Sequence, residues 1–247
     1  MKINYIICAF LLMFSGPLLA QQQFLSKGRI EYERKINVHR QFENEDGDEW
    51  FKEYISKVPK FHNSVFRLSF EGTKTSYRQV GEMDTKTDSW VIGPSKENII
   101  VTDLDKQLQQ SMKKVYEDSY LVQDSIRKME WKLEAETRVI AGFECKKAVG
   151  RICDSVYVVA FYTEEILVNG GPESFSGLPG MILGLAIPRL YTTWFATKVD
   201  LVDSPPNEFN APTKGKKITA DGLQSMLKKS LKDWGKQGQR NVWWVML

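Results

Sequence analysis

The chain has 247 residues, of which 42% are hydrophobic and 26% are charged, and its formal net charge is +3 at pH 7. This length is enough for one sizeable hydrophobic core or two small ones. The near balance of basic and acidic residues gives no electrostatic case for binding nucleic acid or an anionic membrane surface.

The first twenty residues have the pattern of a secretory signal peptide. Lys2 precedes a short apolar stretch, a Gly-Pro break follows, and Ala20 is a small residue at the expected cleavage point. The apolar stretch is too short for a membrane span, which needs roughly 20 residues. We therefore expect residues 1–20 to be removed on export and residues 21–247 to form a single β-rich domain without a membrane span.

The first half of that domain predicts strands around one short helix. Residues 28–40 alternate apolar and charged side chains, which is typical of a half-buried strand. Residues 48–58 have apolar side chains at helical spacing and are followed by a proline, so they predict a short helix. Two alternating runs over residues 64–80 flank the turn "EGTK" and predict a hairpin. Residues 97–104 and 107–118 follow; the second of these runs favours a strand more weakly, and a helix stays possible there.

The second half has stronger strand character and ends in a helix. Residues 126–163 contain short alternating segments at a spacing of about ten residues, as in antiparallel sheets. Residues 189–202 alternate with one shift of phase, which a β-bulge would produce. A capping-box spacing and one apolar stripe predict an amphipathic helix over residues 221–236. The apolar tail, residues 242–247, is expected to form an edge strand or to pack on the sheet.

Together these elements predict a mainly β fold. We expect a strongly curved antiparallel sheet or half-barrel, with a short N-terminal helix and a C-terminal amphipathic helix across its open side. Such a sheet closed by a helix could enclose an apolar cavity, by analogy with periplasmic carriers of lipids.

The cysteines predict a disulfide. Cys8 lies in the expected signal peptide, so Cys145 and Cys153 remain as an even pair in an exported chain. Their spacing of eight residues fits facing positions near the base of a hairpin. A redox or metal pair is the weaker alternative, because the chain has no C-x-x-C motif and its two histidines are distant in sequence.

The sequence contains no recognisable motif for catalysis, a metal or a cofactor. The segment "EDGDE" at residues 45–49 resembles the start of a calcium loop but lacks the required spacing. The two histidines, His39 and His62, stand in unremarkable contexts, and "SFSG" is not a nucleophile elbow. We therefore expect no metal, no cofactor and no catalytic residues, and we lean towards a protein that is not an enzyme.

The most unusual segment is "GGPESFSGLPGMILGL", residues 170–185, which holds five glycines and two prolines. Its glycines permit positive φ angles, and its prolines fix φ and remove amide donors. A type II turn near Leu178, feeding a buried strand, is the favoured interpretation because loop glycines serve turns more often than sites. The functional alternative is a backbone nest or a rigid rim for a ligand.

This segment resembles the signature of the GLPGLI family, exported proteins of Gram-negative bacteria, with Met181 in place of the family's leucine. Upstream, "IAGFECKKA" resembles the family's I-x-G-[YF]-x-C-x-K-A stretch, and "AFYTEEI" resembles its W-Y-T-x-x-I, with Phe161 in place of tryptophan. The resemblance implies a location in the periplasm or cell envelope and a TonB-linked outer-membrane receptor as a partner. It implies no reaction. The candidate ligand or motif residues are Gly171, Pro172, Phe175, Gly177, Leu178, Pro179, Gly180, Lys147 and Tyr162.

The leading functional hypothesis is a non-enzymatic binding or accessory protein of the cell envelope. It would hold a hydrophobic small molecule or act with a TonB-linked outer-membrane receptor. One alternative is an exported hydrolase with a site beside residues 170–180, where a serine, Glu173 or a lysine would meet a histidine or carboxylate. Another is a protein–protein interaction module that docks through the apolar tail.

Overall fold

The computed structural model describes residues 24–43, 49–82, 87, 89–94, 97–153 and 155–247. The predicted signal peptide and most of the "EDGDE" segment lie outside these ranges. The described chain is mainly β, as predicted.

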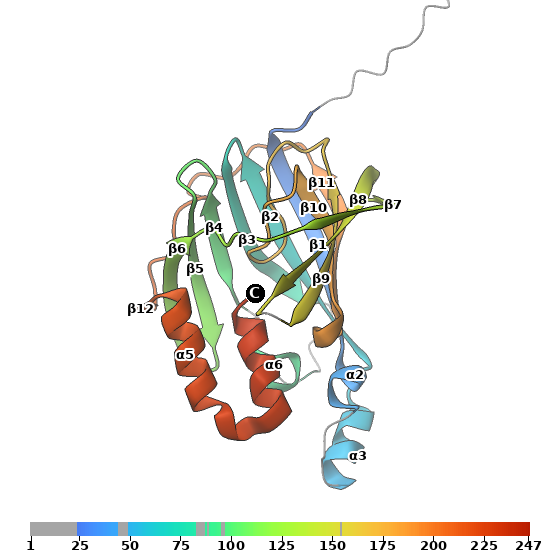
Figure 1. The fold of residues 1–247 in the computed structure, drawn as a ribbon, viewed down its shortest axis with the longest axis vertical. Helices are drawn as coiled ribbons and strands as arrows, with labels where there is room; N and C mark the ends of the chain where they lie inside the picture. Colours follow the sequence, from blue (N-terminus) through green and yellow to red (C-terminus); the bar gives the residue numbers. More distant parts are fainter. Residues whose placement is uncertain (1–23, 44–48, 83–86, 88, 95–96, 154) are drawn as a thin grey trace, which may run out of the picture.

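One twelve-stranded sheet organises the molecule, in the order β12-β6-β5-β4-β3-β2-β1-β11-β10-β9-β8-β7. The pairs are antiparallel except for β12 with β6. The sheet curls, so that β7 runs across the direction of β2 (Figure 1), but its end strands do not pair and it stays open. The strands are β1 Lys27–Asn37, β2 Phe61–Glu71, β3 Lys74–Glu82, β4 Ile99–Asp103, β5 Leu108–Val115, β6 Asp118–Ser125, β7 Lys132–Ile140, β8 Phe143–Ile152, β9 Val156–Thr163, β10 Met181–Ile187, β11 Thr192–Asp200 and β12 Lys216–Ile218.

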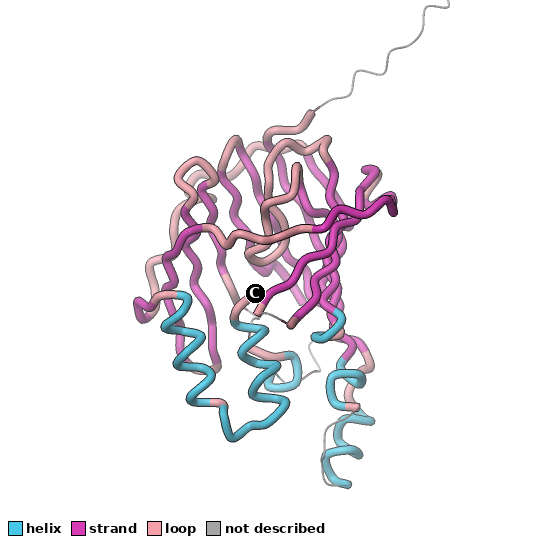
Figure 2. The backbone as a smooth tube through the Cα atoms, in the orientation of Figure 1, coloured by secondary structure: helices cyan, strands magenta, loops and turns pink. Residues whose placement is uncertain are grey.

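The helices are short and gather at one end of the sheet (Figure 2). A small cluster of buried aliphatic side chains fixes α5 and α6 over β5 and β6. The predicted short N-terminal helix corresponds to α3. The helices are α2 Val38–Phe42, α3 Glu49–Lys57, α4 Ser89–Ile92, α5 Ala220–Ser230 and α6 Gly235–Val245, with 3-10 turns η2 at Pro188–Leu190 and η3 at Lys232–Trp234.

Strand β1 shows how the alternating pattern places side chains. Ile30, Tyr32, Arg34 and Ile36 are buried in the interior, whereas the residues between them are exposed or half-buried. Arg34 is therefore in the apolar phase of the strand although it is charged. Its partner across the β1–β2 ladder is Ser64, which is also buried.

The predicted phase shift in β11 is a β-bulge. Glu31 of β1 pairs with Lys198, and the next residue, Tyr32, pairs with Ala196, so Thr197 has no partner in the ladder. Because of this extra residue, the side chains after Ala196 alternate in the opposite phase. This reversal is the shift seen in the hydrophobic pattern.

The predicted helix over residues 221–236 is two helices. Helix α5 ends with Leu231 as its C-cap, and α6 begins at Gly235, whose φ angle is +53°. The tail, predicted to form an edge strand or to pack on the sheet, is not a strand: it belongs to α6 and the residues after it, and Trp244 and Leu247 are fully buried. Trp234 lies at the corner between the helices and is half exposed.

The predicted disulfide is wrong, because no disulfide joins Cys145 and Cys153. Cys145 lies in β8 and Cys153 directly follows it, so the two cysteines share one strand instead of facing each other across a hairpin. Eight residues of extended chain span roughly 26 Å, far beyond the reach of a disulfide. Burial raises the pKa of the Cys145 thiol to about 12.

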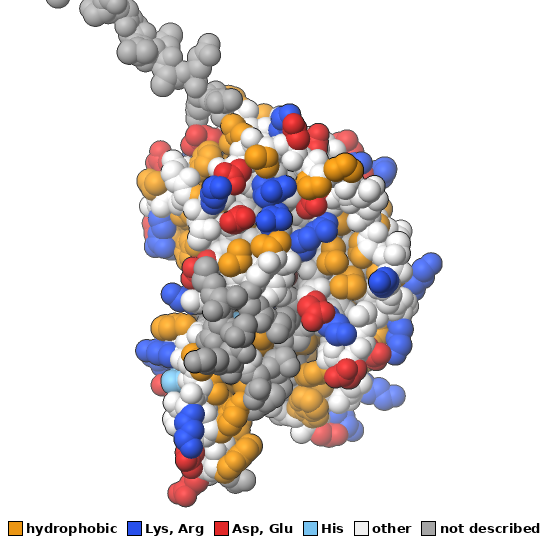
Figure 3. Space-filling model, turned by 180° about the vertical axis from the view of Figure 1, so that it is seen from behind, with side chains coloured by type: hydrophobic (Ala, Val, Ile, Leu, Met, Phe, Trp, Pro, Cys, Tyr) orange, Lys and Arg blue, Asp and Glu red, His pale blue; other side chains and the backbone are white. Residues whose placement is uncertain are grey.

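The outer surface mixes charges of both signs. Lysine and arginine side chains are interspersed with acidic ones on the face opposite to that of Figure 1 (Figure 3). Among the described residues, no helix is both long and apolar enough to cross a bilayer.

The glycine-rich segment crosses the interior before it enters β10. Its residues from Gly170 to Ser176 are buried, and the Ile182 amide bonds the Gly170 carbonyl at 2.8 Å. The predicted type II turn is a tighter turn, since the Gly180 amide bonds the Leu178 carbonyl two residues back, at 2.8 Å. At Gly180, φ is +140°, and an added Cβ would lie 2.0 Å from the Thr163 carbonyl oxygen. Only glycine fits there.

Gly180→Ala is therefore expected to destabilise the protein by about 3 kcal/mol or more, because a backbone contact must open to admit the methyl group. The matched control is Gly142→Ala, at φ +89° with no atom within 4 Å of the added Cβ, which should cost only about 1 kcal/mol. Urea unfolding of both variants measures this difference. Equal losses of stability would show that close packing against Thr163 does not fix this turn.

Candidate functional site

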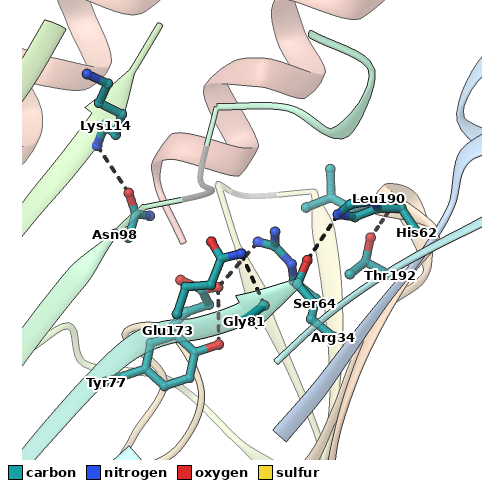
Figure 4. A network of polar contacts seen from close by, with 11 residues as sticks. Arg34, His62, Ser64, Tyr77, Gly81, Asn98, Lys114, Glu173, Leu190 and Thr192 are labelled. Atoms are coloured by element: carbon teal, nitrogen blue, oxygen red, sulfur yellow. Dashed lines mark hydrogen bonds and ion pairs between the residues drawn. The ribbon is translucent and has the colours of Figure 1, made fainter. Parts of the chain in front are cut away.

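A buried carboxylate, Glu173, lies at the centre of the concave side of the sheet (Figure 4). Its Oε1 atom is 4.0 Å from Nη1 of Arg34 in β1 and accepts a hydrogen bond of 3.5 Å from the Tyr77 hydroxyl in β3. The Arg34 guanidinium lies over the ring of Phe66, with 4.6 Å from Cζ to the ring centroid. The glycine-rich segment and three strands thus meet at one charged contact.

Backbone strain accompanies this contact. Glu173 has a φ angle of +54°, in the left-handed region that non-glycine residues rarely adopt. Burial raises the pKa of the Glu173 carboxyl, and the nearby cations of Arg34 and Lys113 oppose that shift. A non-glycine residue held in this conformation costs of order 1–3 kcal/mol, so the surrounding packing must hold it there.

Lys113, in β5, is the second cation near this carboxylate. Its side chain is only 6% exposed, and its ammonium has no hydrogen-bond partner among the described residues. Burial lowers the pKa of Lys113 to about 8. The charge of Glu173 opposes this shift, and the charge of Arg127 adds to it. Lys113 is thus still mostly charged at neutral pH and is not neutralised by a direct ion pair.

The sequence pattern indicates that Arg34 and Lys113 face the interior, although neither was predicted as a site residue. Arg34 falls between Tyr32 and Ile36 in the inward phase of its strand, and Lys113 falls between Ser111 and Val115 in the inward phase of β5. A charged residue in the apolar phase is rarely buried without a partner, so each marked an interior polar cluster.

An open groove of about 910 Å³ lies on the other side of the glycine-rich segment. One wall is the extended connection between β6 and β7, which contains Trp131, and the other is the end of β8 together with Tyr157 of β9. Tyr157 is 57% exposed and Trp131 is half-buried. The polar side chains along the groove are Arg127, Lys128, Glu130, Lys132 and Arg151.

The glycine-rich segment holds one wall of this groove. The indole N–H of Trp131 donates a hydrogen bond of 2.9 Å to the carbonyl of Ser176. The Trp131 ring also packs on Gly150, where an added Cβ would meet ring carbons at 3.0 to 3.1 Å. Trp131 thus links the segment to an open surface. Its role could have been recognised only from its position outside a regular strand.

The residues predicted as ligand or motif positions do not gather around one opening. Gly171, Pro172, Phe175, Leu178 and Gly180 are buried within the glycine-rich segment, whereas Gly177 and Pro179 are exposed at its turn.

The remaining two predicted positions lie on strands. Tyr162 is buried in β9. Lys147 forms ion pairs with Glu134 at 3.1 Å and Glu136 at 2.8 Å on the neighbouring edge strand. This contact gives Lys147 a cross-strand role in pairing β8 with β7.

The contacts described for Ser174 and the two histidines give the hydrolase hypothesis no pairing of Ser174 with a histidine. The Ser174 hydroxyl donates to the Leu247 carbonyl. His39 Nε2 lies 2.9 Å from the Val58 carbonyl, and His62 Nε2 lies 3.0 Å from the Ser64 hydroxyl. Both of these histidine partners lie outside the segment. Across the described ranges, no group of three or more His, Cys, Asp or Glu side chains is arranged to hold a metal ion.

Comparison with known proteins identifies one family. The family described as N-glycanase peptide, N-terminal domain, matches residues 75–224, which is more than half of the chain. No curated protein matches the chain. Two solved structures of PNGF-II, in space groups C2 and P21, match with TM-scores of 0.50 and 0.53 and 18% sequence identity. The matches cover 83% of this chain but 33% and 34% of those chains, so the chain spans about a third of their length.

The predicted membership of the GLPGLI family is therefore wrong. The matching family is the N-glycanase one, and the similar solved structures are those of PNGF-II. The hexapeptide from Gly177 to Ile182 forms a turn that feeds a buried strand, and backbone geometry alone favours such a glycine-proline pattern. A short motif of this kind is weak evidence for a family.

The buried ammonium yields a pH-dependent prediction. Lys113 has a pKa of about 8 in the folded protein and an ordinary value of 10.5 in the unfolded chain, so the unfolded chain binds more protons between these pH values. The free energy of unfolding therefore contains a term that rises from pH 8 to 10.5. Lys113→Met removes this term and should stabilise the protein at pH 7 by up to about 3 kcal/mol.

The measurement is urea unfolding from pH 7 to 10.5 in a buffer without carboxylate or phosphate. The difference between the wild type and Lys113→Met cancels the titration of the tyrosines and should shrink as the pH rises. Lys114→Met, which alters the partly buried neighbour, is the control and should show no such trend. A Lys113→Met variant less stable than the wild type at pH 7 would contradict the prediction.

Proposed function

The chain belongs to the family of the N-glycanase peptide, N-terminal domain, and from that premise we propose that it is a non-catalytic module that binds N-linked glycans in the Trp131 groove. The family description names an enzyme that acts on N-linked glycans, and the match is to that enzyme's N-terminal domain. The observation that carries the proposal is the open groove of about 910 Å³ with Trp131 and Tyr157 in its walls.

The chemistry of the groove suits an oligosaccharide. Sugar rings have apolar faces of C–H groups and rims of hydroxyls, so a site for them combines aromatic faces with polar side chains. Trp131 and Tyr157 supply the aromatic faces, and Glu130 and Arg151 supply an acceptor and donors. The volume of the groove lies within the range of small-molecule sites, which is roughly 300–1,000 Å³.

A binding role, which was also part of the leading hypothesis from the sequence, fits these observations better than the hydrolase or the interaction-module hypothesis. The titratable side chains that line the groove are four cations and Glu130, together with Cys153 and Tyr157. The interaction-module hypothesis required an exposed apolar tail, but Val242, Val245 and Leu247 are buried. In this proposal, N-linked glycans bound in the groove replace the outer-membrane receptor as the partner.

Substitution of the groove aromatics tests the proposal. Isothermal titration calorimetry should show binding of an N-linked glycopeptide and none of the same peptide without its glycan. Tyr157→Ala should weaken this binding about tenfold, because loss of a stacked ring is worth roughly 1–1.5 kcal/mol. Trp131→Ala should weaken it at least as much, and circular dichroism will show whether that variant is folded.

Trp50→Ala is the matched control, because Trp50 is 71% exposed on α3 and does not line the groove. Its affinity for the glycopeptide should equal that of the wild type. Equal affinity in Tyr157→Ala and the wild type, or no difference between the glycosylated and bare peptides, would refute the groove as a glycan site.

A further inference from the structure

A second, smaller cavity lies beneath the C-terminal helices. It has a volume of about 270 Å³ and is bounded by β5, β6, the ends of α5 and α6, and the glycine-rich segment. That volume is equivalent to about nine waters at roughly 30 Å³ each. The sequence predicted an apolar cavity under the helix, but charged and hydroxyl side chains line this one, among them Ser111, Lys113, Arg127 and Ser174.

Two cations that line this cavity, Lys113 and Arg127, each have a donor nitrogen without a hydrogen-bond partner among the described residues. The Lys113 ammonium is buried and has no hydrogen-bond partner among the described residues. Arg127 donates from Nη2 to the Met246 carbonyl, but its buried Nη1 has no partner within the same part of the chain. A buried cation is costly unless an anion or several acceptors meet it. Both residues line this cavity, and each keeps a donor nitrogen without a hydrogen-bond partner in the described part of the chain.

The buried charges near this cavity are also unbalanced. Among the described residues, the fully buried charged side chains are Glu173 and three cations. Arg240 donates a hydrogen bond to the Gln41 carbonyl. The other two cations, Arg34 and Lys113, lie near the single buried carboxylate, Glu173. The two acidic side chains on the cavity wall, Asp124 and Asp221, are exposed, and water screens their charge.

We propose that this cavity is an oxyanion site, which takes the carboxylate or phosphate group of a small ligand. The Lys113 ammonium and the Arg127 guanidinium supply the charge, and the hydroxyl of Ser111, itself 3% exposed, supplies a further donor. The cavity has room for one monosaccharide-sized molecule. This inference is separate from the glycan groove, although Arg127 lines both.

Calorimetric titration of the whole chain with glucuronate, inorganic phosphate and glucose tests the proposal. One of the two anions should bind to the wild type. Binding of glucuronate would identify the ligand group as a sugar carboxylate, and binding of inorganic phosphate would identify it as a phosphate. Glucose should not bind. Lys113→Met should weaken anion binding by at least about tenfold, because a charge-assisted hydrogen bond is lost. Lys114→Met is the control, since its ammonium reaches the exposed Glu117 carbonyl, and it should bind as the wild type does.

Several outcomes would overturn the oxyanion site: no binding of either anion at millimolar concentration, equal binding by Lys113→Met, or equal binding of glucose. Tyr157→Ala separates this proposal from the glycan groove. It should leave anion binding unchanged, and loss of anion binding in this variant would place the anion in the groove and refute the cavity. Conversely, Lys113→Met should bind the glycopeptide normally, so each proposal can fail while the other stands.

Discussion

The contact between Glu173 and Arg34 sets the constraint on which the concave side of the sheet depends. A carboxylate at the tip of a glycine-rich segment is buried at the centre of the sheet and lies 4.0 Å from a guanidinium that is itself 1% exposed. Removing either partner would leave an uncompensated buried charge, which typically costs about 3–5 kcal/mol. The segment is therefore held in the interior although glycine and proline give it few side chains to pack.

The same segment supports the outer groove. Its inner part carries Glu173, and three residues later the Ser176 carbonyl accepts the indole N–H of Trp131. Between these contacts Phe175 is buried in the main core. A rigid connection thus links the interior charge to the orientation of an aromatic ring at the surface. A ring fixed in this way loses little conformational entropy when a ligand stacks on it, which favours binding.

The sequence predicted the elements better than the site, and the physical reason is local. Alternation over β1, β2 and β11 gave the strands and the bulge, because period-two burial is written in adjacent residues. The corner at Leu231 to Gly235 was not predicted. The helical conformation of the tail was not predicted either, because an apolar tail packs equally well as a strand or a helix. The cysteine pair was misread, because spacing alone does not say whether two residues share a strand or face each other.

The site was harder to predict because its residues are distant in sequence. Arg34, Lys113 and Glu173 meet only after β1, β5 and the glycine-rich segment are brought together in one sheet. The alternating pattern marks Arg34 and Lys113 as inward-facing charges, but it does not say which residues they meet. Trp131 and Tyr157 likewise line one groove only because β8 brings the connection before β7 close to β9.

The most direct measurement is a ¹H–¹⁵N NMR titration of the whole chain with an N-linked glycopeptide. We expect the indole signal of Trp131 and the amide signals of Arg151 and Tyr157 to shift, because these residues line the groove. The indole signals of the fully buried Trp194 and Trp244 should stay in place. Shifts confined to residues outside the groove, or no shifts at saturating glycopeptide, would contradict the assignment of this chain as a glycan-binding module.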